Sequence, residues 1–284
     1  MYKLLYYFLR PIINRNKIFN NKYKGEDVYI FGNGVSLKYY NLDHFKNKNI
    51  LSCGYFFINN FFKEMNICAH TEIDPFILYP IEKHKFKKNL QKNYVRDIYH
   101  NNFPLNDVPL ITSVTNLFAF KKYTNIFFTH HFGTKNDVYN IKKVDISNKM
   151  MFMSGSMYFL IALSKYMGFE RVFLVGMDYI NTEPENGHFY EFGKGTKFSH
   201  SKSYLEFNNY FFRFFKEYLN LSVINRRNKI ASCDLNNIFY EDFFDSKEKY
   251  SENTEICSKD GLDILHSMSK SLFPYAKDIY QFSK

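Results

Sequence analysis

The sequence has no tryptophan, and its four cysteines stand far apart: Cys53, Cys68, Cys233 and Cys257. Zinc modules and disulfide frameworks need cysteines in a close, regular spacing such as Cys-x-x-Cys. The cysteine pattern argues against both classes and fits a reducing compartment. We therefore expect a cytoplasmic protein.

A long hydrophobic run is also missing. Residues 4–9 are uncharged and apolar, whereas a membrane-spanning helix needs about 20 such residues, and no small-residue cleavage site follows. The first 24 residues nevertheless contain no acidic residue and six cations, which are Lys3, Arg10, Arg15, Lys17, Lys22 and Lys24. Two interpretations stay open for this basic amphipathic segment: it lies as a peripheral element on the inner membrane, or it packs on the protein's own core.

No recognised nucleic-acid-binding motif occurs, although 38 Lys+Arg face 28 Asp+Glu and the formal net charge is +10. The charges are scattered rather than gathered in a stripe. The richness in Tyr, Phe, Asn, Lys and Ile is what an AT-rich coding sequence produces. A nucleic-acid-binding protein is therefore the weakest alternative, and we expect no nucleic-acid partner.

Metal-binding patterns are absent as well. His130 and His131 are adjacent in the sequence, and neighbouring side chains of an extended chain point to opposite sides. No Asp-x-Asp pair stands nearby to hold a metal-bound diphosphate. We therefore expect no metal site.

At 284 residues the chain can form one large α/β domain, or one domain with a subdomain. Apolar runs and periodicities predict strands at 28–31, 48–54, 65–70, 125–130, 171–175 and 221–225, and helices at 80–92, 157–167 and 204–218. Residues 93–110 hold two prolines and few clear periods, which predicts a loop with a short strand. We divide the chain into the N-terminal segment (1–24), a catalytic domain (25–244) and a polar surface loop with a C-terminal helix (245–284).

The first predicted strand runs directly into Gly32-Asn33-Gly34, and Ser36 follows. In an open α/β sheet, ligands bind at the carboxyl edge, where glycines let backbone amides approach a phosphate. The turn lacks the third glycine of a dinucleotide fingerprint. A nucleotide-binding loop and a tight connection to the next helix both remain open.

A second block, residues 154–179, contains a helix followed by a strand. Ser154 and Ser156 stand at the predicted helix start, where unpaired amides and the helix dipole favour an anion. Asp178 follows the strand at the carboxyl edge. It is either a ligand-binding group or a carboxylate that stabilises the turn.

Residues 180–202 are rich in Asn, Glu, Gly and Lys, and contain His188, Tyr190 and His200. Three glycines in this segment make it a candidate mobile lid over the edge of the sheet. The aromatic positions at helical spacing that follow it are a core-packing face.

Taken in order, these motifs resemble those of the bacterial sialyltransferases of glycosyltransferase family 42. The resemblance spans about residues 28–235 and rests on Gly32-Asn33-Gly34-Val35-Ser36-Leu37-Lys38, Ser154-Gly155, Gly176-Met177-Asp178-Tyr179 and Ser199-His200-Ser201-Lys202. It implies a Rossmann-like parallel sheet with helices on both faces, a GT-A-like variant, and a lid subdomain. It also implies an inverting transferase that uses CMP-sialic acid without a metal.

The resemblance further implies roles for single residues. Asn33 matches an asparagine that contacts the nucleotide, and Ser154 with Gly155 matches the donor-binding pair. His200 matches the general base, a role that suits an imidazole with a reference pKa of about 6.5. Tyr190 matches a lid tyrosine that hydrogen-bonds the departing phosphate. His188 lies in the same segment and is a rival base.

Four positions depart from the family pattern. Ile180 replaces a second phosphate-contacting tyrosine, for which Tyr179 is a substitute. Gly54 replaces a ribose-side asparagine, Asp74 replaces the asparagine of an Asn-Pro pair, and Met151 replaces an arginine. These departures leave the donor sugar open among sialic acid, Kdo and other nonulosonic acids.

The sequence therefore predicts a metal-independent glycosyltransferase that moves an acidic sugar from a CMP-sugar to a glycan or glycolipid acceptor such as lipooligosaccharide. The positive net charge suits both substrates. Donor-binding residues are predicted at Gly32, Asn33, Gly34, Ser36, Ser154, Gly155, Asp178 and Tyr179, and catalytic residues at His200, Tyr190 and His188. No cofactor is expected beyond the donor substrate, and a homo-oligomer is compatible with the sequence. A metal-dependent relative that transfers a diphosphate group is the other enzyme alternative.

Overall fold

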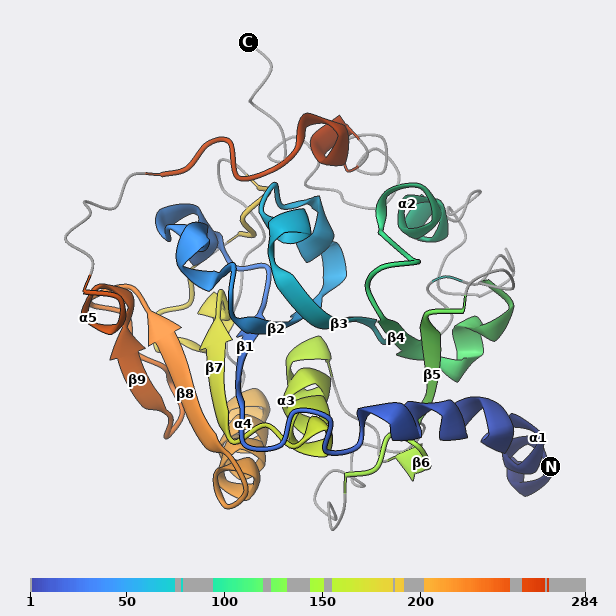
Figure 1. The fold of residues 1–284 in the computed structure, drawn as a ribbon. Helices are drawn as coiled ribbons and strands as arrows, with labels where there is room; N and C mark the ends of the chain where they lie inside the picture. Colours follow the sequence, from blue (N-terminus) through green and yellow to red (C-terminus); the bar gives the residue numbers. More distant parts are fainter. Residues whose placement is uncertain are drawn as a thin grey trace.

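The computed structural model describes residues 2–74, 78, 94–119, 124–131, 144–150, 155–185, 187–191, 202–245, 252–263 and 265. These residues form an α/β fold around one nine-stranded sheet (Figure 1). Its strands, all parallel to their neighbours, are β1 (Asp27–Phe31), β2 (Asn49–Cys53), β3 (Asn66–Glu72), β4 (Leu110–Ser113), β5 (Ile126–His131), β6 (Lys149–Met150), β7 (Arg171–Val175), β8 (Asn220–Asn225) and β9 (Asn236–Phe239). The predicted fold class is confirmed.

The order of the strands is β6-β5-β4-β3-β2-β1-β7-β8-β9. The chain lays down β2 to β6 on one side of β1 and then returns to place β7 to β9 on the other. Ligands of open α/β sheets bind at such a reversal, outside the carboxyl ends of the strands. The exit loops of β1 and β7 therefore meet where a ligand is expected.

Helices cover both faces of the sheet. The α-helices are α1 (Tyr2–Asn14), α2 (Tyr94–Asn102), α3 (Ser156–Met167), α4 (Lys202–Lys216) and α5 (Tyr240–Phe243), and the 3-10 helices include η1 (Arg15–Phe19), η2 (Val35–Tyr39), η3 (Leu42–Phe45), η4 (Gly54–Ile58) and η8 (Asp178–Ile180). Val28 and Ile30 share a core with α3 and α4. Tyr29 and Phe31 share the other core with η2 to η4, α2 and α5. Because successive side chains of a strand point to opposite faces, the uninterrupted apolar run of β1 matches a sheet covered on both sides.

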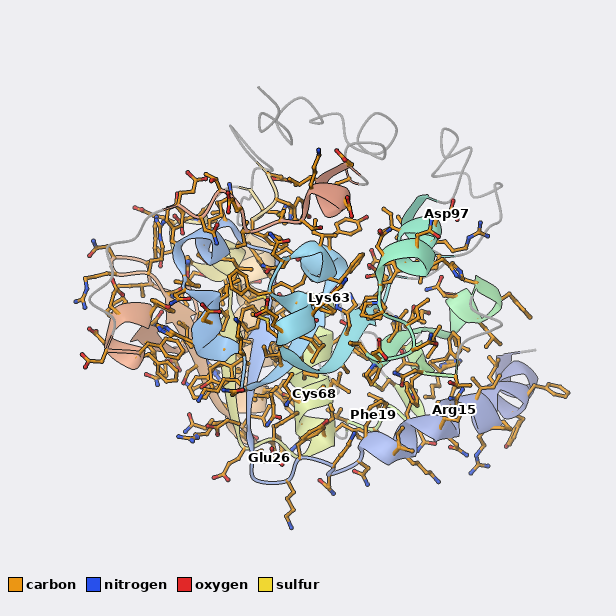
Figure 2. The ribbon with its side chains drawn as sticks, turned by 45° about the horizontal axis from the view of Figure 1, so that its top comes forward. Arg15, Phe19, Glu26, Lys63, Cys68 and Asp97 are labelled. Atoms are coloured by element: carbon orange, nitrogen blue, oxygen red, sulfur yellow. The ribbon has the colours of Figure 1, made fainter. Side chains whose placement is uncertain are left out.

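The N-terminal segment is anchored to this domain by Phe19, which lies in the core (Figure 2). Phe19 is only 1% exposed. Asn16 is buried, and its amide donates to two backbone carbonyls, one of them in β5. In contrast, Tyr7 and Phe8 of α1 are 66% and 73% exposed. Ile13 near the end of α1, Asn16 and Phe19 therefore pack on the core, while Tyr7 and Phe8 of α1 lie on the surface. No described helix is long and apolar enough to cross a bilayer.

Among the elements that differ from the sequence prediction are α2, β6 and β9. Residues 94–102 form α2 rather than a loop, because Val95, Ile98 and Tyr99 are buried at helical spacing and this burial outweighs their polar neighbours. The edge strand β9 has no counterpart in the prediction, since its polar sequence Asn-Asn-Ile-Phe is only partly buried. The helix predicted at 80–92 lies outside the described residues.

Part of the C-terminal region also differs. Its polar composition predicts a surface loop, yet Ile256 is fully buried and Cys257 is 7% exposed. The backbone nitrogen of Asn60 donates to the Ile256 carbonyl at 2.9 Å, and that of Ser258 donates to the Ile58 carbonyl at 3.1 Å. Residues 252–263, in orange-red, thus lie beside η4, near the carboxyl edge of the sheet (Figure 1).

Candidate functional site

The Gly-x-Gly turn after β1 packs directly on the exit loop of β7. The backbone nitrogens of Gly32 and Gly34 donate to the carbonyls of Val175 and Gly176, both at 2.8 Å. A β-carbon on Gly34 would lie 2.6 Å from the Gly176 oxygen and would overlap the Asp178 carboxylate. The close approach of the two backbones therefore requires glycine at both positions, whether or not the turn also contacts a ligand.

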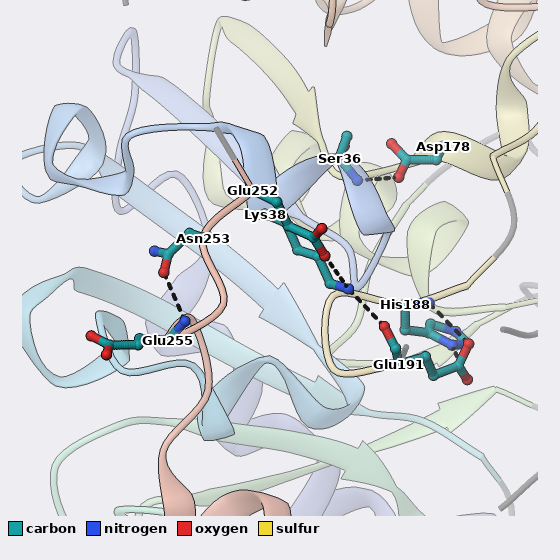
Figure 3. Close-up of polar contacts among 8 residues, drawn as sticks. All are labelled: Ser36, Lys38, Asp178, His188, Glu191, Glu252, Asn253 and Glu255. Carbon is teal, nitrogen blue, oxygen red and sulfur yellow. Dashed lines mark hydrogen bonds and ion pairs between the residues drawn. The ribbon is translucent and has the colours of Figure 1, made fainter. Parts of the chain in front are cut away.

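Asp178 lies beneath this turn. Its carboxylate is buried and accepts a hydrogen bond from the backbone nitrogen of Ser36 at 2.7 Å (Figure 3). Burial raises the pKa of Asp178 from 3.8 to about 6, and the bond from Ser36 partly offsets this rise. Of its two predicted roles, this geometry is that of a carboxylate that stabilises the turn.

Asn33 occupies the centre of the turn. Its amide nitrogen donates to the Cys53 carbonyl at the end of β2, at 3.3 Å. Its side-chain oxygen is buried and has no hydrogen-bond partner within the described part of the chain. Gly54 has φ of +58°, and a β-carbon there would lie 2.7 Å from the Asn33 amide nitrogen. Asn33 is thus held with an acceptor oxygen that a donor group of a ligand can satisfy.

The start of α3 lies at the same edge. The hydroxyl of Ser156, the first residue of α3, contacts the buried Cys53 thiol, whose pKa burial raises to about 12. Gly155 caps the helix with φ of +102° and is exposed. The amino end of a 12-residue helix therefore lies beside the end of β2, to which Asn33 is also bonded. Ser154, predicted for this place, lies outside the described residues.

Residues 187–191 run along the turn. Gly34 and His188 form an isolated antiparallel bridge, and the Phe189 nitrogen donates to the Asn33 carbonyl at 2.9 Å. The His188 ring is parallel to the Tyr190 ring, with centroids 5.0 Å apart. The structure thus joins His188 and Tyr190 to the predicted nucleotide turn by backbone hydrogen bonds.

Glu191 orients His188 (Figure 3). Its carboxylate lies 2.8 Å from Nδ1 of His188 and accepts a bond from the His188 backbone nitrogen at 3.0 Å. Glu191 is 6% exposed. A proton on Nδ1 that faces the carboxylate leaves the lone pair on Nε2, which is the arrangement of a general base. The sequence prediction missed Glu191, although the His-x-x-Glu spacing within a turn was a usable signal.

The remaining predicted residues lie elsewhere or outside the described ranges. Tyr179 is partly buried and packs against the core formed with α3 and α4, and its role as a phosphate donor stays a prediction. His200 lies outside the described residues. His131 is buried and bonded to Thr129 and to the Ile73 carbonyl, and burial lowers its pKa to about 4. Among the described residues, no group of three or more His, Cys, Asp or Glu is placed to hold a metal.

No protein-family model matches the chain, and no curated protein sequence matches it. Among solved structures, it is similar to the MAf glycosyltransferase from Magnetospirillum magneticum AMB-1 at 10% identity and a TM-score of 0.48, over 92% of this chain and 42% of that one. It is also similar to the sialyltransferase CstII from Campylobacter jejuni, solved with cytidine-5'-monophosphate, at 14% identity and a TM-score of 0.39, over 88% of this chain and 99% of that one.

The buried carboxyl group of Asp178 makes the free energy of unfolding depend on pH. Because its pKa is raised, its contribution to stability is complete below about pH 4 and is lost as the pH rises through about 6. Asp178→Asn keeps an acceptor for Ser36 and cannot ionise. At about 1.4 kcal/mol per pKa unit, we expect this variant to be up to roughly 3 kcal/mol more stable than the wild type at pH 7.5, and no more stable at pH 4. Urea unfolding at both pH values measures this difference, and an equal difference at the two would contradict the assignment.

Proposed function

We propose that the chain is a glycosyltransferase that moves an acidic sugar from a CMP-sugar to a glycan acceptor. The observation that carries the proposal is the hydrogen-bonded contact between residues 188–191 and the Asn33–Gly34 turn at the reversal point of the sheet. This contact brings a candidate base and a candidate hydroxyl donor to the place where open α/β sheets bind ligands. The resemblance of the ordered motifs to family 42 sialyltransferases supplies the substrate class.

The donor nucleotide would lie between the turn and the start of α3. The buried oxygen of Asn33 would accept a bond from a hydroxyl or amino group of the nucleotide, which removes the cost of leaving this oxygen without a partner. The amino end of α3 would bind the single phosphate of CMP, since unpaired amides and the helix dipole favour an anion there. Gly155 leaves this end open, because it has no side chain.

The reaction then follows from the two aromatic side chains. Nε2 of His188 removes the proton from an acceptor hydroxyl, and the oxygen attacks the anomeric carbon of the sugar. The bond between this carbon and the phosphate oxygen breaks, and CMP leaves with the electron pair. The Tyr190 hydroxyl donates a hydrogen bond to the departing phosphate. Attack opposite the leaving group inverts the anomeric centre, and no step requires a metal.

The substrates and the cellular site belong to the same proposal. The donor sugar is a nonulosonic or ulosonic acid of the sialic acid or Kdo type, and the acceptor is a cell-surface glycan such as lipooligosaccharide. A net charge of +10 favours both an acidic donor and a phosphorylated glycolipid. The protein would act at the cytoplasmic face of the inner membrane, with α1 on the lipid surface.

Nucleotide selectivity tests the donor class. We expect CMP and CMP-sugars to bind in the presence of EDTA, and CDP and UDP to bind at least tenfold more weakly. Asn33→Ala should weaken CMP binding about tenfold, because a hydrogen bond to a buried acceptor is lost. Isothermal titration calorimetry of both proteins measures these affinities. A preference for a diphosphate that requires a metal would instead support the diphosphate-transferring alternative.

The identity of the base is tested by two matched variants. His188→Gln should reduce kcat at least 100-fold while the dissociation constant of CMP stays within threefold, because general-base catalysis contributes about 100-fold to 10,000-fold. His200→Gln is the matched control and should retain most of the activity. Steady-state transfer assays with a CMP-sugar measure both. If the large loss occurs with His200→Gln, then His200 is the base, as the sequence motif alone suggests.

Membrane contact is tested with point variants, because removing residues 1–24 would also remove the buried Phe19. Phe8→Ser should at least halve the fraction that sediments with vesicles containing anionic lipids, since Phe8 is 73% exposed within a segment that carries only positive charges. Ile230→Ser is the control, because Ile230 is 54% exposed in a different part of the chain. Equal sedimentation of the two variants and the wild type would remove α1 from the proposal.

A further inference from the structure

Lys38, the last residue of the motif that begins at Gly32, has a buried amine. The residue is 3% exposed. Its Nζ donates to the backbone carbonyl of Glu191 at 2.7 Å and lies 3.2 Å from a carboxylate oxygen of Glu252 (Figure 3). The amine therefore joins the motif after β1 to two segments that are distant in the sequence.

Stability alone does not account for a lysine in this place. Burial disfavours the charged form and lowers the pKa of Lys38, and the carboxylate of Glu252 offsets part of this effect. Apolar residues of similar volume are usually as stabilising as a buried ion pair, or more so. What a buried lysine supplies, and an apolar residue cannot, is a directed hydrogen bond to a chosen acceptor.

That acceptor belongs to the residue that orients the candidate base. The carbonyl of Glu191 is held by Lys38, and its carboxylate holds His188 through both Nδ1 and the backbone nitrogen. A backbone that is fixed at Glu191 reduces the freedom of the carboxylate, and through it the freedom of the imidazole ring. Glu191 is therefore the one residue that connects the Lys38 amine to the imidazole ring of His188.

The C-terminal region completes this arrangement. The Asn253 backbone nitrogen donates to the Lys38 carbonyl at 2.7 Å. Residues 252–253 therefore contact both the side-chain amine and the backbone carbonyl of Lys38. The side chain of Asn253 accepts a bond from the Glu255 nitrogen at 2.9 Å, and the Ile256 carbonyl is bonded to Asn60. Glu252 itself is on the outer side, with 44% of its side chain exposed.

We propose that Lys38 is a positioning residue that orders the His188–Glu191 pair through its bond to the Glu191 carbonyl. This inference rests on the proposed function, because it assigns Lys38 to the reaction in which His188 is the base. Lys38 acts through Glu191 and does not touch the substrate. Glu252 partly neutralises the buried amine and is less important than the bond to the carbonyl.

Kinetics of five variants test this role. We expect Lys38→Met to reduce kcat about tenfold, with the dissociation constant of CMP within threefold of the wild type, and Lys38→Arg to restore part of the loss because it keeps a donor. Glu252→Gln is the matched control and should stay within threefold in kcat. The double variant Lys38→Met/Glu191→Ala should be no slower than Glu191→Ala alone, because Lys38 acts on His188 only through the Glu191 side chain, which is already missing.

Hydrogen exchange provides a readout that does not depend on activity. In Lys38→Met the amides of residues 187–191 should exchange at least tenfold faster than in the wild type, while those of β1 and β7 stay unchanged. Unchanged exchange there, or losses in kcat that multiply in the double variant, would overturn the positioning role. A wild-type protein that fails to bind CMP would refute the proposed function, and the exchange experiment would still decide whether Lys38 orders residues 187–191.

Discussion

The contact between the exit turn of β1 and the exit loop of β7 is the constraint on which the rest of the site depends. Two backbone hydrogen bonds of 2.8 Å join strands that are more than a hundred residues apart in the sequence. They require glycine at positions 32 and 34, because a β-carbon would overlap the β7 loop. Every other group of the site is placed relative to this contact.

Buried polar groups maintain the geometry on both sides of the turn. The carboxylate of Asp178 accepts a hydrogen bond from the backbone nitrogen of Ser36 in η2. Lys38, in the same helix, donates a hydrogen bond to the Glu191 carbonyl. Each of these groups loses its hydrogen bonds to water on burial. Directed hydrogen bonds within the protein compensate for part of that loss. Directed hydrogen bonds of this kind favour one arrangement of the loops over others. A catalytic site needs one such arrangement, and apolar packing alone selects it less specifically.

The strands β1 and β7 could be predicted from the sequence, because positions of a strand that are buried on both faces of the sheet are mostly apolar. After their first residues, Asp27 and Arg171, both strands are apolar at every position. The edge strand β9 could not, since an edge strand is half exposed and its residues carry little periodic signal. The helix α2 could not be predicted either, because its three buried positions stand among polar residues. Only their packing in the tertiary structure identifies these positions as part of the core.

For the candidate site, the sequence alone determined the Gly-Asn-Gly turn, its place after a strand and the presence of His188 and Tyr190 in a glycine-rich segment. These features are local, and local residue types specify them. The tertiary structure decided that residues 187–191 pair with the turn, that Asp178 bonds to Ser36, that Glu191 bonds to His188 and that Lys38 bonds to the Glu191 carbonyl. Pairings of this kind join residues far apart along the chain, and they depend on strand order, which no short motif encodes.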